Sequence, residues 1–366
     1  MKKLFKSVRF WLIVILPLTF LLKYLFANCT EAANFYCDYI YRYISVLFNR
    51  IAGIFPFSLA EYLIVTAVIF GTFYVFFIIV SSLMSSGKRA RTFLIGISNL
   101  LCIVSAGFFI FNTNCGFNYY RSDFEELSGM KTSPTNVHQL YDTCVYLAEN
   151  AAESGKKVQR DQNGTAVLTG NTYQIAAQAV NDLHQKYDFI YDGYAAPKGV
   201  VFSRAMSYMN ITGVYFPLTF EANVNVDVPK YTIPSTMCHE LAHVRGFMRE
   251  EDANFVSFLA CTMADNDDLN YSGYMMALSY SANALYAADK ELYAELVRQY
   301  YTKEMITDMQ SSSEYWQQFE TPVAETASQI NDSYLKANDQ DDGVKSYGKM
   351  TDLVIAYYID LSKNAS

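Results

Sequence analysis

Three apolar stretches in the first third of this 366-residue chain limit what it can fold into more than any other feature. They are Phe10–Phe26, Leu59–Met84 and Phe93–Phe111. Each is close to the roughly 20 residues that a helix needs to cross a bilayer. The sequence therefore predicts a membrane anchor with three transmembrane helices over 1–113 and a separate domain over 114–366. A cleaved signal peptide is the alternative for the first stretch, but no A-x-A cleavage site follows it.

The distribution of charge indicates on which side of the membrane the second domain lies. Basic residues gather before the first stretch and between the second and third: Lys2, Lys3, Lys6, Arg9, Lys88, Arg89 and Arg91. By the positive-inside rule these segments are cytoplasmic, so we expect 114–366 outside the cytoplasmic membrane. That domain holds eighteen Lys and Arg against thirty-three Asp and Glu. Because phosphate contacts need basic residues, we expect membrane lipid and no nucleic acid as a partner.

The second domain contains an H-E-x-x-H element that begins at His239 and ends at His243. On a helix, residues four apart lie on the same face, so the two imidazoles can bind one Zn²⁺. Glu240, beside the first histidine, can accept a proton from a zinc-bound water. Pro234 supplies a helix start and Gly246 a helix stop, which favours a helix here. The alternative is an ordinary helix face with solvated His and Glu side chains.

A third zinc ligand has to come from another element, because a catalytic zinc usually has three protein ligands and one open position. We expect the chain to turn at Gly246 and a second helix to begin near Arg249. The first turn of that helix carries Glu250, Glu251 and Asp252. Carboxylates in a first turn also complement the helix dipole without any metal, so the residues alone leave all three open.

Five segments of the chain carry a further signal. They are H-E-L-A-H-V-R-G-F from His239, E-x-x-A-N-F over Glu250–Phe255, Gly213–Asn225, Gly116–Arg121 and Tyr334–Tyr347. Together they resemble a membrane-anchored family known as domain of unknown function 3810, and the resemblance implies a zinc-dependent, gluzincin-like metallopeptidase of unknown substrate. It also implies that Glu250 is the third zinc ligand and that Asn254 contacts a ligand histidine. Asp252 departs from the usual E-x-E-A-N of the family, and it remains, with Glu251, a weaker ligand candidate.

The domain over 114–366 is expected to be α+β, a mainly helical, zincin-like domain with a small sheet. Helices are predicted at Pro134–Ala152, Thr172–Tyr187, Tyr271–Tyr301, Glu314–Leu335 and Met350–Leu361. A short apolar run at Gly199–Ser203 and the alternation over Gly213–Asp227 predict strands. Pro217 lacks a backbone N–H, so the second strand is expected at a sheet edge, where it could pair with an extended peptide.

The other cysteines and histidines are weaker candidates for chemistry. Six cysteines would face an oxidising compartment, where disulfides can form: Cys29, Cys37, Cys115, Cys144, Cys238 and Cys261. Cys238 precedes His239 and so points about 100° away around the helix, which argues against a zinc ligand. His138 and His184 have no partner at ligand spacing and are expected at the surface or at helix caps. Asn338–Gly343 lacks the full calcium-loop pattern.

The expected function is hydrolysis of peptide bonds in an envelope or extracellular protein or peptide, by a membrane-tethered zinc metallopeptidase with Glu240 as general base. An oxyanion stabiliser is also expected. Its candidates by residue type are Arg245, Tyr271, Tyr274 and Tyr347. The alternatives are a zinc-containing membrane sensor or binding module without turnover, and a scaffold protein with a structural zinc. An open metal position would separate the enzyme from both.

Overall fold

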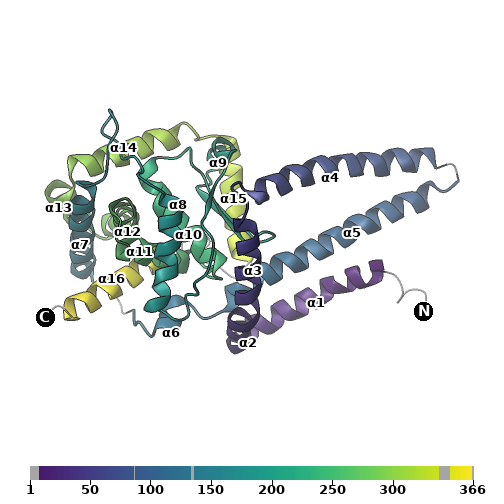
Figure 1. The fold of residues 1–366 in the computed structure, drawn as a ribbon, viewed down its shortest axis with the longest axis horizontal. Coiled ribbons are helices and arrows are strands. Elements are labelled where there is room, and N and C mark those ends of the chain that lie inside the picture. The colour runs from purple at the N-terminus through teal and green to yellow at the C-terminus, as the bar shows by residue number, and fades with distance from the viewer. Residues whose placement is uncertain (1–7, 86, 133–135, 338–346, 365–366) are drawn as a thin grey trace.

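The computed structural model describes residues 8–85, 87–132, 136–337 and 347–364. Within them the chain is mostly helical and has a small three-stranded sheet. Figure 1 shows three long helices that project to one side of a rounded, mainly helical body. The prediction of a mainly helical chain with a small sheet and three apolar N-terminal helices is therefore confirmed.

The projecting helices are α1 (Val8–Asn28), α4 (Leu59–Met84) and α5 (Arg89–Asn114). By length and composition, all three are long and apolar enough to cross a membrane. Most of their large apolar side chains are exposed, as lipid-facing side chains would be. α1 packs along α5, where Ser105 Oγ donates a hydrogen bond to the Leu12 carbonyl at 2.5 Å. These three helices fit a membrane protein.

A shorter helical segment crosses the base of the long helices, between them and the body (Figure 1). It consists of α2 (Thr30–Tyr36), the π-helical turn η1 (Cys37–Tyr41) and α3 (Arg42–Gly53). The buried Tyr41 hydroxyl donates a hydrogen bond to the Val244 carbonyl at 3.0 Å. This contact ties the segment to the centre of the body.

The body is built around α10 (Ile233–Val244) and α11 (Glu250–Met263), which are almost entirely buried. Phe255, Phe258 and Leu259 of α11 are fully buried, so burial of these side chains stabilises the pair of helices. The other helices of the body are η2 (Gly116–Tyr120), α6 (Phe124–Ser128), α7 (Val137–Gly155), α8 (Thr172–Asp182), η3 (Leu183–Gln185), α9 (Ser203–Tyr208), η4 (Lys230–Thr232), α12 (Asp267–Ala288), α13 (Lys290–Tyr300), α14 (Lys303–Gln317), α15 (Pro322–Ala337) and α16 (Tyr347–Asn364).

Three predicted helices are confirmed with shifted ends. Pro134–Ala152, Thr172–Tyr187 and Met350–Leu361 correspond to α7, to α8 with η3, and to α16. α7 begins with a capping box, in which the Asn136 side chain accepts from the Gln139 N–H and the Gln139 side chain accepts from the Asn136 N–H. The start predicted at Pro134 and the turn at Asn338–Gly343 lie outside the described residues.

Two predicted helices are each divided in two. Tyr271–Tyr301 breaks between α12 and α13 at Asp289, whose carboxylate accepts hydrogen bonds from the first N–H groups of α13. Glu314–Leu335 breaks between α14 and α15, where Pro322 takes the first position of the new helix. Both predictions were wrong because helix-start residues were read as helix interior.

The sheet has the strand order β1-β3-β2. β3 (Glu221–Val224) is the central strand, and all four of its residues are buried. β1 (Lys198–Gly199) pairs with it in parallel, and β2 (Gly213–Phe216) pairs with it in antiparallel fashion. β2 is therefore an edge strand, with one side of its backbone left without a partner strand in the described chain.

The prediction of one long strand over Gly213–Asp227 was wrong. The chain turns at 217–220, where the Phe220 N–H donates to the Phe216 carbonyl at 2.9 Å, and it returns as β3. Pro217 lies in this turn rather than inside a strand, so its missing N–H costs no ladder hydrogen bond. The strand predicted over Gly199–Ser203 was also wrong, since β1 ends at Gly199 and α9 begins at Ser203.

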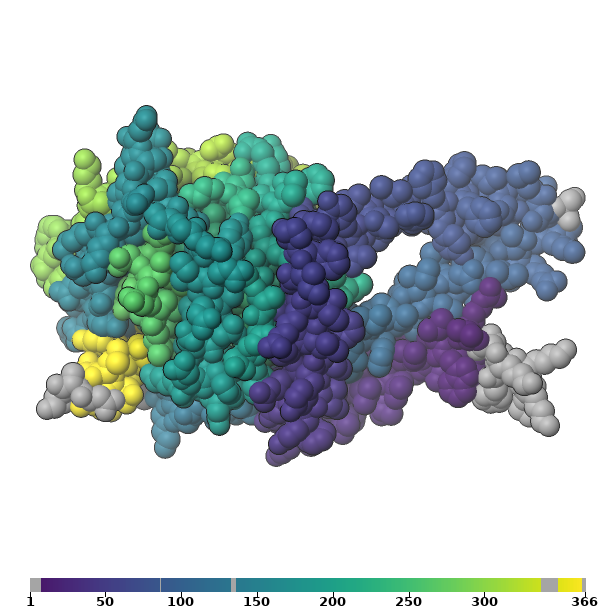
Figure 2. Space-filling view, viewed as in Figure 1, coloured from purple at the N-terminus to yellow at the C-terminus, as the bar shows by residue number. Residues whose placement is uncertain are grey.

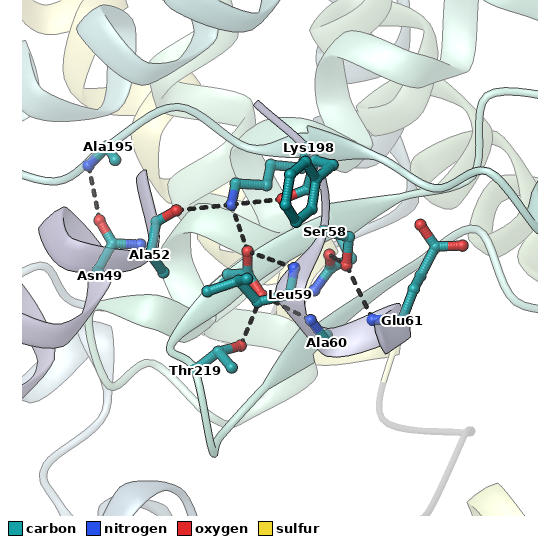
Figure 3. A network of polar contacts seen from close by, with 12 residues as sticks. Asn49, Ala52, Ser58, Leu59, Ala60, Glu61, Ala195, Lys198 and Thr219 are labelled. Atoms are coloured by element: carbon teal, nitrogen blue, oxygen red, sulfur yellow. Dashed lines mark hydrogen bonds and ion pairs between the residues drawn. The ribbon is translucent and has the colours of Figure 1, made fainter. Parts of the chain in front are cut away.

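A buried ion pair holds the sheet against α3 and the chain that follows it (Figure 3). Lys198 Nζ contacts the Glu221 carboxylate, and the two side chains are 9% and 2% exposed. The same ammonium donates to the carbonyls of Ala52 at 2.7 Å and Phe57 at 2.9 Å. Three acceptors therefore satisfy the three N–H bonds of the buried lysine.

The start of α4 is held by carboxylates (Figure 3). Glu221 accepts from the N–H groups of Leu59 at 3.1 Å and Ala60 at 2.9 Å. These N–H groups have no partner inside the helix, so an anion there caps it and complements its dipole. The Glu61 side chain accepts in turn from the N–H groups of residues 201 and 202, at 3.0 and 2.9 Å. The direction in which α4 leaves the body is thus fixed by polar contacts.

Replacement of Lys198 by Met should destabilise the protein, because Glu221 would stay buried without its cation. Removal of one partner from a buried ion pair costs about 3–5 kcal/mol. Unfolding of the full chain in detergent micelles, followed by circular dichroism, measures the loss. Lys156→Met, at an exposed pair with Glu153, is the control and should leave the unfolding midpoint unchanged. Equal midpoints for both variants would contradict the role given to this pair.

Candidate metal centre

α10 presents His239 and His243 on one face, one turn apart, with ring centroids 4.5 Å from each other. The helix ends where the chain takes a left-handed conformation at Gly246, with φ 87°. There the Gly246 N–H donates to the His243 carbonyl at 2.9 Å, and the Phe247 N–H donates to the Ala242 carbonyl at 3.2 Å. This pair of bonds closes the helix end and reverses the chain, as the glycine predicts.

The reversed chain brings the first residue of α11 back to the histidines. Glu250 Oε2 lies 3.4 Å from His239 Nε2, and Glu250 Oε1 lies 3.6 Å from His243 Nε2. One ligand atom from each of the three residues fits within 4.8 Å of the others. Burial raises the pKa of Glu250, but the hydrogen bond and charge of His239 outweigh it and lower that pKa to about 2. Glu250 is thus an anion aimed at both imidazoles.

A contact at Nδ1 orients each imidazole ring. His239 Nδ1 lies 2.9 Å from Asn254 Oδ1, and His243 Nδ1 lies 2.6 Å from the Phe247 carbonyl. Both acceptors are oxygens, so each Nδ1 donates its proton and each Nε2 is turned toward Glu250. The predicted contact of Asn254 with one of the two histidines is therefore present, at His239.

The two histidines differ in their affinity for a proton. Burial lowers the pKa of His239, but its hydrogen bond with Glu250 raises that pKa overall, to about 9. Burial and the neighbouring His239 together lower the pKa of His243 to about 4. A cation shared by these rings would have to displace the proton of His239.

Glu240 lies buried in the same place, and its Oε2 has no hydrogen-bond partner within the described parts of the chain. Burial raises its pKa to about 8, against the opposing charge of His239. Gly213 of β2 passes directly over this carboxylate: a Cβ on Gly213 would lie 2.5 Å from Glu240 Oε1 and 2.8 Å from the methyl group of Thr236. Only glycine lets the edge strand come this close, so Gly213 is a site residue that the sequence reasoning missed.

These residues suit a zinc ion. Two imidazole nitrogens and one carboxylate are a common donor set of catalytic zinc, which keeps its fourth position open. The unpartnered oxygen of Glu240 faces the same cleft, where it can take a hydrogen bond from a water or a substrate group. A structural zinc would instead take its four ligands from the protein.

The other two acids of the first turn point elsewhere. Glu251 Oε1 lies 3.7 Å from Lys349 Nζ. Asp252 Oδ1 accepts from the Phe124 N–H at 3.1 Å, and burial raises the pKa of Asp252 to about 7. Of the three candidates, Glu250 is the acid that the structure brings to the histidines.

The remaining cysteines and histidines do not join the cluster. All seven cysteines lie in the described part of the chain, and each is a free thiol there. Cys238 is fully buried and shares a hydrogen bond with Cys261 on α11. His138 is exposed on α7, and His184 Nδ1 bonds to the Ile190 carbonyl at 3.0 Å.

Two of the oxyanion candidates are structural. Arg245 is fully buried and donates to the carbonyls of Tyr191 and Leu241, both at 2.8 Å. The Tyr271 hydroxyl donates to Asp308 at 2.6 Å. Neither side chain lines the cleft that holds the histidines.

Different tyrosines occupy the cleft. Tyr119 and Tyr334 line it, and their hydroxyls lie 3.2 Å apart. Both belong to segments that carry the family resemblance, and that resemblance is the sequence signal that could have identified them as site residues. Tyr274 packs against other aromatic rings outside the cleft, and the side chain of Tyr347 lies outside the described structure.

The cleft has a volume of about 520 Å³ and contains His239, Glu240, His243 and Glu250. One wall is the segment 209–217, which includes the edge strand β2. Met248, the end of α5 with η2, and the helix α15 supply the rest: Met248, Phe111, Cys115, Tyr119, Ala327, Ser328, Asn331, Tyr334 and Leu335. A cleft of this size beside an unpaired strand edge can hold several residues of extended chain.

The model of a family described as protein of unknown function (DUF3810) matches residues 36–355. The chain belongs to the DUF3810 family. The match runs from the end of α2 into α16, so it covers α4, α5 and the whole candidate metal centre. A search of curated proteins and a search of solved structures gave no match. Membership in DUF3810 therefore supports the resemblance seen in the sequence and assigns no activity.

Proposed function

We propose that this DUF3810 protein is a membrane-tethered, zinc-dependent metallopeptidase whose catalytic domain lies outside the cytoplasmic membrane. The observation that carries the proposal is the convergence of His239, His243 and Glu250 beside the unpartnered carboxylate of Glu240. The excess of basic residues at the cytoplasmic ends of the predicted spans supports the location.

In the proposed mechanism, His239, His243 and Glu250 would hold the zinc, and Asn254 and the Phe247 carbonyl keep the rings in place. Bound zinc would polarise the scissile carbonyl and lower the pKa of a water to about 7. Glu240 accepts the proton of the attacking water and returns it to the nitrogen of the leaving amine.

The substrate is held as an added strand. β2 is an edge strand that lines the cleft, and Gly213 brings its backbone against Glu240. An extended peptide paired with β2 would place a backbone carbonyl close to the metal centre. Tyr119 and Tyr334 are the cleft hydroxyls that could donate to the oxyanion.

Glu240→Gln should keep the zinc and reduce peptide cleavage by about 10²–10⁴-fold, because the amide cannot accept the proton. The test uses the full chain in lipid nanodiscs, zinc analysis, and a mixed-sequence peptide pool followed by mass spectrometry. Glu149→Gln, an exposed change on α7, is the matched control and should retain the wild-type rate. Cleavage by Glu240→Gln at the wild-type rate would contradict the proposal. Zinc-loaded wild-type protein that cleaves nothing would favour the sensor or binding module.

Gly213→Ala should also reduce cleavage while zinc stays bound, because the added methyl group would displace Glu240 or β2. A displacement of about 1 Å can cost roughly 10²-fold in rate. The same peptide assay measures it, and Gly348→Ala is the control, since a Cβ there meets nothing within 4 Å. Equal rates for the two variants would show that the close approach of β2 to Glu240 does not matter.

A further inference from the structure

We propose that the cleft takes juxtamembrane segments, the stretches of chain that emerge from the bilayer in proteins anchored in the same membrane. This inference rests on the proposed peptidase function and names its substrate class. The observation that carries it is that the end of an apolar, membrane-length helix forms part of the cleft wall.

α5 reaches the cleft directly. Phe111, in its last turn, and Cys115, just beyond it, both line the cleft. The Phe111 ring packs against Tyr334 of α15, with centroids 6.0 Å apart. Phe111 is also the last residue of the apolar stretch, so it marks the edge of the hydrocarbon layer. The candidate metal centre and that edge therefore border the same cavity.

Polar contacts hold β2 at the end of the same helix. Asn114 Nδ2 donates to the Pro217 carbonyl at 2.8 Å, and the Tyr215 hydroxyl donates to the Asn114 carbonyl at 2.8 Å. The edge strand cannot move away from α5 without breaking both bonds. A peptide that pairs with β2 thus lies beside the point where α5 leaves the membrane.

Apolar side chains are exposed at the roots of the long helices. Leu218 follows Pro217 in the turn that contacts α5, and it is 50% exposed. Val201 and Phe202, 82% and 58% exposed, are held at the start of α4 by Glu61. Exposed apolar side chains beside two spans fit contact with lipid rather than with water.

The segment α2–α3 extends this apolar surface. Exposed apolar and aromatic side chains recur on it every four residues: Phe35, Tyr39, Tyr43, Leu47 and Ile51. Figure 1 and Figure 2 show the segment across the base of the long helices, against the body. An amphipathic helix in this position lies in the boundary between headgroups and acyl chains. The body therefore sits on the bilayer, with the α5 wall of its cleft at the membrane surface.

This placement selects among substrates. A folded soluble protein would have to bring a loop into the narrow space between the body and the bilayer. A segment that leaves the bilayer beside α5 is already there, at a high effective concentration. The cut bond should lie within about ten residues of the anchor, since ten extended residues reach about 35 Å.

The test uses the zinc-loaded full chain co-reconstituted in phosphatidylcholine–phosphatidylglycerol vesicles with random-sequence 40-residue peptides that carry an N-terminal palmitoyl chain. Mass spectrometry gives the position of each cut relative to the anchor. All bonds of one peptide share the same anchor, so binding of the peptide to the vesicle enriches every bond of that peptide equally. Enrichment at the membrane therefore cannot by itself explain a preference for bonds near the anchor. Glu240→Gln supplies the blank, and the same pool without the acyl chain is the comparison.

We expect cuts per bond in the first ten residues to exceed those beyond residue twenty by about tenfold, and the pool without the acyl chain to be cut far more slowly. Cuts spread evenly along the peptide, or equal cleavage of both pools, would overturn the inference and leave the peptidase function standing. Zinc-loaded protein that cuts neither pool would overturn both.

Discussion

The two backbone hydrogen bonds at Gly246 are the contacts on which the candidate site depends. They end α10 at Val244 and direct the chain back, so that α11 begins only six residues later, at Glu250. The candidate metal ligands on α10 and α11 are therefore separated by a short turn and not by a long loop. Because α10 and α11 form the centre of the core, packing holds the turn on both sides.

The titratable groups of the candidate metal centre are electrostatically unfavourable when no cation is bound. Glu240, Glu250 and the two histidines lie close together, where burial raises the pKa of Glu240, and burial together with His239 lowers that of His243. Glu250 and His239 compensate each other as a pair. A divalent cation would supply the positive charge that two neighbouring carboxylates need, which is why we propose a metal at this cluster.

The sequence predicted those parts of the molecule whose signals are local. The helix end at Gly246, the ligand spacing of His239 and His243, and the three apolar helices each depend on residues close together in the chain. The hairpin of β2 and β3 was missed because apolar residues alternate through its turn, so that two short strands looked like one long strand. The break at Asp289 was missed because one capping residue interrupts an otherwise helical pattern.

Long-range partners could not have been predicted. Nothing near Lys198 indicates that it will pair with Glu221, nor that Glu221 will cap α4. In the same way, Tyr334 reaches the cleft from α15, more than 90 residues after His239, by tertiary packing alone. Contacts of this kind connect the three long apolar helices to the candidate site.

Zinc-edge X-ray absorption of the purified full-length protein tests the central claim most directly. The account predicts one zinc per chain, with two imidazole nitrogens at about 2.0–2.1 Å, a carboxylate oxygen, and one oxygen from solvent. Absence of zinc, a sulfur neighbour at about 2.3 Å, or a shell of four protein ligands would contradict it.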